Sequence, residues 1–257
     1  MQDDIEVQVH AFYQRLASDP HHRYRSWEHC FTCFSRRTIL TTPERLDTAA
    51  LHLAFYLASW GMYRGSSALL WKDYTIHKPA ISNLLAPRYQ CLWDLQLDDP
   101  GQDTTTADLI LSLARELSRT YSEEIKTVNG KPVAPSFQPT DTLITKILLG
   151  TIGCTPACDR FFIDGFRHTK LPYSRFGSAF LREVFQFYRD QKAAFWNAQH
   201  SIKQQSGINY PPMQLLDMYF WQIGSALPQD ARRSTLHSKD NSASPTLPPT
   251  TAAHDPY

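Results

Sequence analysis

Apolar residues recur three and four positions apart along most of the chain, which is the spacing of one face of an α-helix. This periodicity predicts helices over residues 5–17, 25–37, 80–86, 107–126, 141–149, 157–167, 174–204 and 212–223. From Ala49 to Met62 almost every position is apolar, as in a helix that other helices surround. The pattern therefore predicts an all-α fold around one central buried helix.

Two segments lack the helical pattern. Residues 127–139 contain the pair Asn129-Gly130 and three prolines, so we expect an irregular connection with a short β-hairpin. From Ser225 onward the chain consists mainly of Ser, Thr, Pro, Ala and Asp, which bury too little apolar surface to offset the entropy of ordering. We therefore expect a single helical domain over residues 1–224 and a disordered tail over residues 225–257.

The composition agrees with a helical globular protein. The 257 residues are 42% hydrophobic and include only ten glycines, which is few for a fold full of tight turns. The formal net charge of +1 provides no global attraction to nucleic acid or to an anionic membrane, so any nucleic-acid binding must be local. The sequence has neither a secretory signal nor an apolar run of the roughly 20 residues that span a membrane. We expect a cytoplasmic protein that does not bind membranes.

The cysteines Cys30, Cys33, Cys91, Cys154 and Cys158 lie in apolar, helix-like surroundings, so we expect reduced, buried thiols. The first two and the last two could together supply four thiolates to zinc. The residues between them, however, are Phe, Thr, Pro and Ala rather than the glycine-rich turns of zinc ribbons. No phosphate-binding P-loop, dinucleotide fingerprint, serine-nucleophile elbow or zinc-protease motif occurs. We predict neither a metal nor a cofactor.

The segment from Ser59 to Ser67 has the composition of a binding site. An almost wholly apolar helix ends in Arg64, and a guanidinium cannot be buried without a partner. The arginine must therefore meet a carboxylate, such as Glu28, Asp159 or Asp217, a cluster of carbonyls, an anionic ligand or solvent. The candidate ligand contacts in this segment are Trp60, Tyr63, Arg64, Ser66 and Ser67.

A second polar cluster lies on the predicted helix 25–37. Arg25, Glu28 and His29 are three and four residues apart and therefore share one stripe of the helix. An arginine, a carboxylate and an imidazole together could position a substrate and move protons. They could equally form a surface ion pair beside a solvated histidine. The Arg-x3-His spacing is shorter than the Arg-x4-to-6-His signature of the helical HEPN ribonucleases.

A third candidate runs from Lys146 through a turn with Gly150 and Gly153 to Asp159 and Arg160. This helix-turn-helix segment, about 20 of the 257 residues, resembles in outline the helix-hairpin-helix DNA glycosylases. The resemblance implies that the glycines bring backbone N–H groups to a phosphate, that Lys146 is a nucleophile and that Asp159 is catalytic. The Leu-Pro-Gly-Val-Gly turn of that family is absent. The glycines could instead form a tight interhelical turn, with Asp159 as a helix cap or ion-pair partner.

Residues 57–67 and 146–157 resemble the fixed signatures of an uncharacterised bacterial protein family, a resemblance that implies no activity. Our first hypothesis is that the three clusters form one polar pocket for an anionic or nucleotide-like ligand. In an extension of this hypothesis, the protein also acts on the ligand, and the catalytic residues would be Glu28, His29, Lys146 and Asp159. The alternatives are a non-catalytic protein-interaction module, and a glycosylase-like nucleic-acid enzyme, which would require a basic groove around Gly150 to Gly153.

Overall fold

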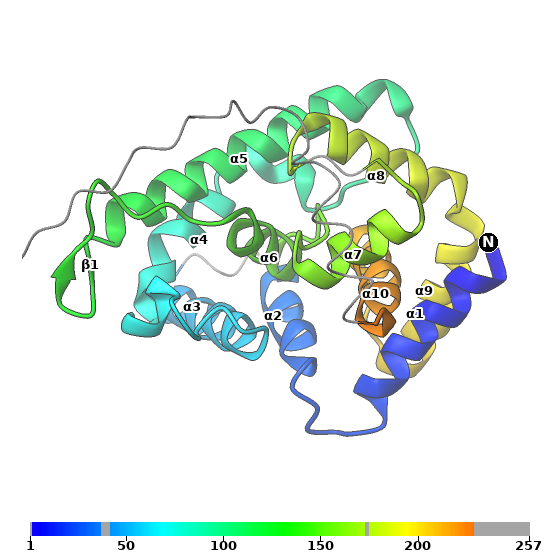
Figure 1. The fold of residues 1–257 in the computed structure, drawn as a ribbon, viewed down its shortest axis with the longest axis horizontal. Helices are drawn as coiled ribbons and strands as arrows, with labels where there is room; N and C mark the ends of the chain where they lie inside the picture. Colours follow the sequence, from blue (N-terminus) through cyan, green and yellow to red (C-terminus); the bar gives the residue numbers. More distant parts are fainter. Residues whose placement is uncertain (1, 37–41, 173–174, 229–257) are drawn as a thin grey trace, which may run out of the picture. The chain divides into compact units, whose positions relative to one another are not determined.

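The computed structural model describes residues 2–36, 42–172 and 175–228, and their backbone is mainly helical (Figure 1). The elements are α1 (Gln2–Ala17), α2 (Arg25–Ser35), α3 (Pro43–Ser59), η2 (Ala68–Trp71), η3 (Tyr74–His77), α4 (Lys78–Leu84), η4 (Pro87–Leu92), η5 (Pro100–Gln102), α5 (Asp103–Glu124), β1 (Thr127–Val128), β2 (Lys131–Pro132), α6 (Asp141–Thr151), α7 (Arg160–His168), α8 (Ser178–Asp190), α9 (Lys192–Ser206) and α10 (Pro212–Ala226). The all-α prediction is confirmed.

All of these elements belong to one compact unit, residues 1–226. A second unit, residues 227–257, contains only Leu227 and Pro228 as described residues, so the tail predicted for 225–257 lies outside the described residues beyond Pro228. Within the described ranges, no helix combines the length and apolar character that a membrane span requires. All five cysteines are free thiols. Burial is confirmed for Cys30, Cys154 and Cys158, whereas Cys33 is half-buried and Cys91 is exposed.

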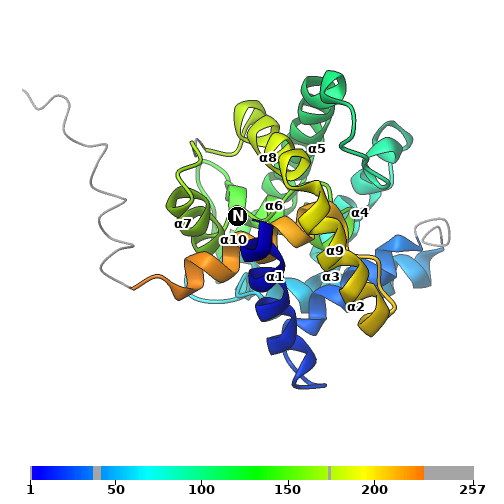
Figure 2. The same cartoon turned by 90° about the vertical axis from the view of Figure 1, so that its right-hand side faces the viewer.

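The most deeply buried helices are α6 and α10. All residues from Leu143 to Thr151 in α6 are buried, as are all residues from Met213 to Gln222 in α10. Both helices lie in the middle of the unit in two perpendicular views (Figures 1 and 2). Helices distant in sequence pack together around them, including α1 with α9 and α10, and α2 with α3 and α6. The core is therefore built from both ends of the chain.

The central helix predicted from Ala49 to Met62 is a surface helix on one side. Leu51 and Phe55 of α3 are 55% and 56% exposed. The opposite face of α3 packs against α2, α4 and α6. A continuous run of apolar residues does not by itself show that a helix is surrounded, since exposed apolar side chains are common on folded proteins.

Two glycines allow α7 and α10 to cross at backbone contact. A Cβ atom at Gly165 would lie 1.9 Å from the carbonyl oxygen of Phe220, and one at Gly224 would lie 1.9 Å from the carbonyl oxygen of Phe161. No side chain larger than hydrogen fits at such a distance. This close crossing holds the start of α7 beside the buried face of α10.

The connections differ in how well the sequence predicted them. The hairpin is confirmed, because β1 pairs antiparallel with β2, and Asn129 and Gly130 both have the positive φ angles of a tight hairpin turn. The helix predicted over 174–204 is instead two helices, α8 and α9, which meet at Gln191. The backbone N–H of Gln191 still bonds to the carbonyls of Phe187 and Tyr188. The sequence around Gln191 contains no glycine or proline, so it gave no signal that the helix ends there.

Candidate functional site

A cavity of about 300 Å³ lies where five segments of the chain meet, and we call it the Trp60 pocket. Its walls come from the turn before α2, the end of α3 and the turn after it, α6, the start of α7, and α10. The lining residues are Arg23, Tyr24, Trp60, Gly61, Met62, Arg64, Thr142, Lys146, Asp159, Arg160, Phe161 and Trp221. The pocket thus combines residues from the first and third sequence candidates.

A buried ion pair forms the floor of the Trp60 pocket. The Nζ atom of Lys146 lies 2.8 Å from Oδ2 of Asp159, and the two side chains are 2% and 15% exposed. The other carboxylate oxygen, Oδ1, accepts a hydrogen bond of 3.1 Å from the backbone N–H of Phe162, so Asp159 is the N-cap of α7. The ammonium also lies 4.8 Å from the ring centroid of Trp60. Carboxylate and aromatic face together compensate the burial of the charge.

A second carboxyl group lies near this pair. Asp217 of α10 is buried, and its Oδ1 accepts a hydrogen bond of 2.8 Å from the backbone N–H of Ala157. Burial and, to a smaller extent, the charge of Asp159 raise the pKa of Asp217 to about 8. The charge of Lys146 and the hydrogen bond from Ala157 oppose this shift. At neutral pH, Asp217 is therefore mostly protonated.

Three arginines line the pocket above this floor. Among the described residues, no carboxylate forms an ion pair with Arg23, Arg64 or Arg160. The guanidinium carbons of Arg23 and Arg160 lie 4.9 and 4.8 Å from the ring centroids of Tyr24 and Phe161. Of the alternatives for Arg64, the tie to a buried carboxylate (Glu28, Asp159 or Asp217) is wrong, and solvent contact is present, because the side chain is exposed.

Arg64 reaches the pocket because the chain turns sharply after α3. Gly61 has φ of +80°, and a Cβ atom there would lie 2.8 Å from Nε of Arg64. The arginine side chain therefore folds back over Gly61. Any residue other than glycine at this position would both strain the backbone and displace the guanidinium.

Aromatic rings form the remaining wall of the Trp60 pocket. Trp60 stacks on Tyr24, with ring centroids 4.3 Å apart and an interplanar angle of 18°. Trp221 contacts Trp60 and Phe161 edge-on, at centroid distances of 6.3 and 5.1 Å. Tyr24 covers one face of Trp60 and the ammonium of Lys146 lies over its ring, so this wall offers ring edges next to the three guanidiniums. Edges and guanidiniums together suit a ligand that carries both a planar ring and a negative charge.

Three of the predicted ligand contacts lie elsewhere. The hydroxyl of Tyr63 is 2.7 Å from Nε2 of His77, a fully buried histidine whose Nδ1 is 2.6 Å from the hydroxyl of Tyr121. The hydroxyl of Ser67 donates to the carbonyl of Met62 and caps η2. Ser66 is exposed and lines none of the described cavities. Only Trp60 and Arg64 of this segment's candidates line the Trp60 pocket.

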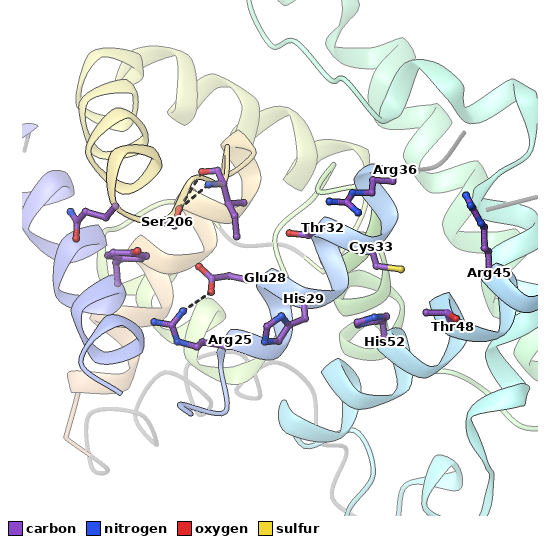
Figure 3. A pocket seen from close by; sticks show the side chains of 13 residues that line it. Arg25, Glu28, His29, Thr32, Cys33, Arg36, Arg45, Thr48, His52 and Ser206 are labelled. Carbon is purple, nitrogen blue, oxygen red and sulfur yellow. Dashed lines mark hydrogen bonds and ion pairs between the residues drawn. The ribbon is translucent and has the colours of Figure 1, made fainter. Parts of the chain in front are cut away.

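The second cluster lies in a different cavity. Arg25, Glu28 and His29 line a groove of about 650 Å³ along α2 (Figure 3). The carboxylate of Glu28 is buried and accepts hydrogen bonds from Arg25, at 3.2 Å, and from the hydroxyl of Tyr210, at 2.8 Å. The ion pair of the second interpretation is therefore present, but it is not a surface pair, because Glu28 is buried. His29 is exposed, and its charge adds to burial in lowering the pKa of the nearby His52.

The expectation that all three clusters share one pocket is thus wrong. Trp27 lies on the face of α2 that packs against α6, and its indole N–H donates to the carbonyl of Leu149. Residues on a helix are rotated by roughly 100° from one position to the next. Glu28 and His29 therefore point away from α6, and so away from Lys146.

The glycines of the α6–α7 turn serve packing. A Cβ atom at Gly150 would lie 2.3 Å from the ring of Tyr56, and one at Gly153 would lie 2.5 Å from Pro211. The backbone N–H of Gly153 already donates to the carbonyl of Leu148. The described lining of the cavity beside Gly153 contains Asp94 but no lysine or arginine. These contacts fit the interhelical-turn interpretation and give no support to a phosphate contact there.

Comparison with protein-family models, with curated proteins and with solved structures found no match. In the described part of the chain, no group of three or more His, Cys, Asp and Glu side chains is placed to hold a metal ion. The candidate site therefore depends on its own geometry, in which Lys146, Asp159, Arg160, Trp60 and Arg64 come together as the sequence suggested.

Proposed function

We propose that the Trp60 pocket binds a small anionic ligand that carries a planar ring, such as a nucleotide. The observation that carries this proposal is the set of three guanidiniums, from Arg23, Arg64 and Arg160, that have no carboxylate partner among the described residues. Guanidinium groups bind phosphate and carboxylate through paired hydrogen bonds. The neighbouring stacked rings of Tyr24 and Trp60 provide contact for a planar group.

The charge and size of the pocket narrow the class of ligand. The three arginines contribute +3, whereas Lys146 and Asp159 cancel each other. A phosphate monoester carries roughly −1.5 to −2 at neutral pH, which three guanidiniums can fully balance. The volume of about 300 Å³ is at the lower end for small-molecule sites, which span roughly 300 to 1,000 Å³. A pocket of this size can hold a mononucleotide but not a longer oligonucleotide.

Calorimetric titration with AMP, adenosine and inorganic phosphate tests the proposal. We expect AMP to bind more tightly than either part, because only AMP supplies both a ring and a phosphate. Arg64→Ala and Arg160→Ala should each weaken AMP binding about tenfold, the loss of one charge-assisted contact. Trp60→Leu should weaken AMP and adenosine alike.

Arg119→Ala is the matched control, because Arg119 is a 72% exposed arginine that does not line the pocket. It should leave AMP binding unchanged. Equal affinities in wild type, Arg64→Ala and Arg160→Ala would show that the pocket is not the binding site. So would an equal loss in Arg119→Ala.

A glycosylase-like enzyme is less well supported, because the described lining of the cavity beside Gly153 lacks the basic residues that it requires. Among the described contacts, only the 2.8 Å pair of Lys146 and Asp159 agrees with it. In this pair the carboxylate is the more accessible group, at 15% exposed, whereas the ammonium is 2% exposed and already bound. Base release from oligonucleotides by the wild type, absent in Asp159→Asn, would support this candidate. The third hypothesis, an interaction module, would be favoured by a large exposed apolar patch, and Leu51 and Phe55 of α3 are 55% and 56% exposed. We place it after ligand binding because three arginines line the Trp60 pocket.

A further inference from the structure

A third titratable group, the buried Asp217, interacts with the Lys146–Asp159 pair of the Trp60 pocket without itself lining the pocket. Asp217 is 2% exposed, and the charges that act on it are those of Asp159, before α7, and Lys146, in α6. The other titratable groups that sense its charge are Tyr56, in α3, and Cys158, and its charge raises the pKa of both. One buried ammonium thus interacts with two carboxyl groups, of which Asp159 is within hydrogen-bonding distance of it.

Asp159 and Asp217 are expected to share one proton, because two negative charges close together in a buried environment repel each other. Asp159 is bound by Lys146 and by the N-terminus of α7, both of which favour its ionised form. Asp217 has one hydrogen bond, from the backbone N–H of Ala157. The proton therefore belongs on Asp217. The three groups are then neutral together, and they carry −1 when Asp217 ionises.

We propose that the Trp60 pocket binds its anion together with one proton, and that Asp217 holds this proton. The inference presupposes the anion binding proposed above and adds its regulation by pH. A negative charge that enters the pocket disfavours ionisation of Asp217, and by thermodynamic linkage a proton on Asp217 favours the anion to the same extent. Asp217 would not contact the ligand; it would act on the bound anion through its own charge.

The predicted pH dependence follows from the pKa of about 8 for Asp217. Below this pH the floor of the pocket is neutral, and the three arginines act on the anion without opposition. Above it, a negative charge lies behind Lys146 and offsets part of their attraction. Anion binding should therefore weaken as the pH rises, although the arginines stay charged throughout this range.

Sulfate is the best probe, because its charge stays at −2 across the range while that of a phosphate changes. Calorimetric titration of the wild type should give an affinity about tenfold lower at about pH 9.5 than at about pH 7, the effect of a shift of about one pKa unit on binding. At about pH 8 the binding heat should depend on the ionisation enthalpy of the buffer, because Asp217 is half protonated in the free protein and takes up as much as about half a proton per sulfate bound. Asp217→Asn should bind sulfate equally well at both pH values.

Asp98→Asn is the matched control, since it makes the same chemical change, a carboxyl group to an amide, at an exposed pair with Lys192. It should keep the pH dependence of the wild type. Asp159→Asn gives an independent test if Asp217→Asn does not fold. An asparagine at position 159 can still cap α7. Because the charge of Asp159 raises the pKa of Asp217, its loss should move the midpoint of the pH dependence to lower pH.

Two results would overturn the role of Asp217 while leaving anion binding intact. One is sulfate binding by the wild type that is equal at both pH values, and the other is an unchanged pH dependence in Asp217→Asn. A complete absence of sulfate and AMP binding at every pH would refute the proposed function and the inference together. In that case the carboxylic acid band in the infrared spectrum would still show whether Asp217 is protonated.

Discussion

Replacing Lys146 by methionine removes the ammonium that faces Asp159 and Asp217 but keeps most of the apolar volume. Removing one partner of a buried ion pair costs about 3–5 kcal/mol, because the other charge stays buried. The contact of the ammonium with the face of Trp60 is worth about 1–2 kcal/mol more. Asp159 is 15% exposed and keeps its hydrogen bond from Phe162, which reduces the loss. We expect Lys146→Met to lower the free energy of unfolding by about 3–4 kcal/mol at neutral pH.

Urea denaturation measures this loss, and a double variant identifies its cause. Lys146→Met/Asp159→Asn has no unpaired charge at this position, so it should be more stable than Lys146→Met by at least about 1 kcal/mol. Lys192→Met is the control, because its pair with Asp98 is exposed and should cost less than about 1 kcal/mol. A loss below about 1 kcal/mol in Lys146→Met, or a double variant no more stable than it, would refute the interpretation of Lys146 as the compensating charge.

Three further predictions concern stability. Gly165→Ala would place a Cβ atom 1.9 Å from a backbone oxygen of Phe220, so calorimetry should show a loss of about 3 kcal/mol or more. His77→Phe removes the hydrogen-bond partner of two tyrosine hydroxyls, so urea denaturation should show a loss of about 2–4 kcal/mol in the free energy of unfolding. Because burial lowers the pKa of His77 to about 3, the wild type should lose stability as the pH falls from about 6.5 to about 3, and His77→Phe should lack that loss. The raised pKa of Asp217 should make wild-type stability fall between about pH 4 and pH 8, a slope absent in Asp217→Asn.

The helical periodicity was enough to predict the fold class and most helices, but not which helix is central. The buried stretch of α6, residues 143–151, contains Lys146 and two threonines, whereas the only strongly polar side chains from Ala49 to Met62 are those of His52 and Ser59. This stretch of α6 is nevertheless the more deeply buried. Its polar atoms have partners that the sequence does not specify, such as the backbone N–H of Cys158 for the hydroxyl of Thr145. Burial of polar residues depends on such tertiary partners, so periodicity alone could not rank the helices.

About half of the candidate site could be predicted from the sequence. Arg64 and Lys146 stood out because charged side chains are unusual within apolar segments. Tyr24 and Trp221 were missed, since aromatic residues at helical spacing normally belong to a core. Arg25 and His29 were placed in the wrong cavity, because the direction of a helical stripe is known only when the packed face of the helix is known.

The packing of α1 against α9 and α10 has a consequence for the synthesis of the protein. About 200 residues separate the end of α1 from the start of α10. Translation adds roughly 5–20 residues per second, so about 10–40 s pass between the synthesis of α1 and that of its packing partner α10. During that time the stripe formed by Ile5, Val9, Phe12 and Leu16 has no cover from α10. A nascent chain that stalls before Pro212 would present this stripe to chaperones and to other unfinished chains.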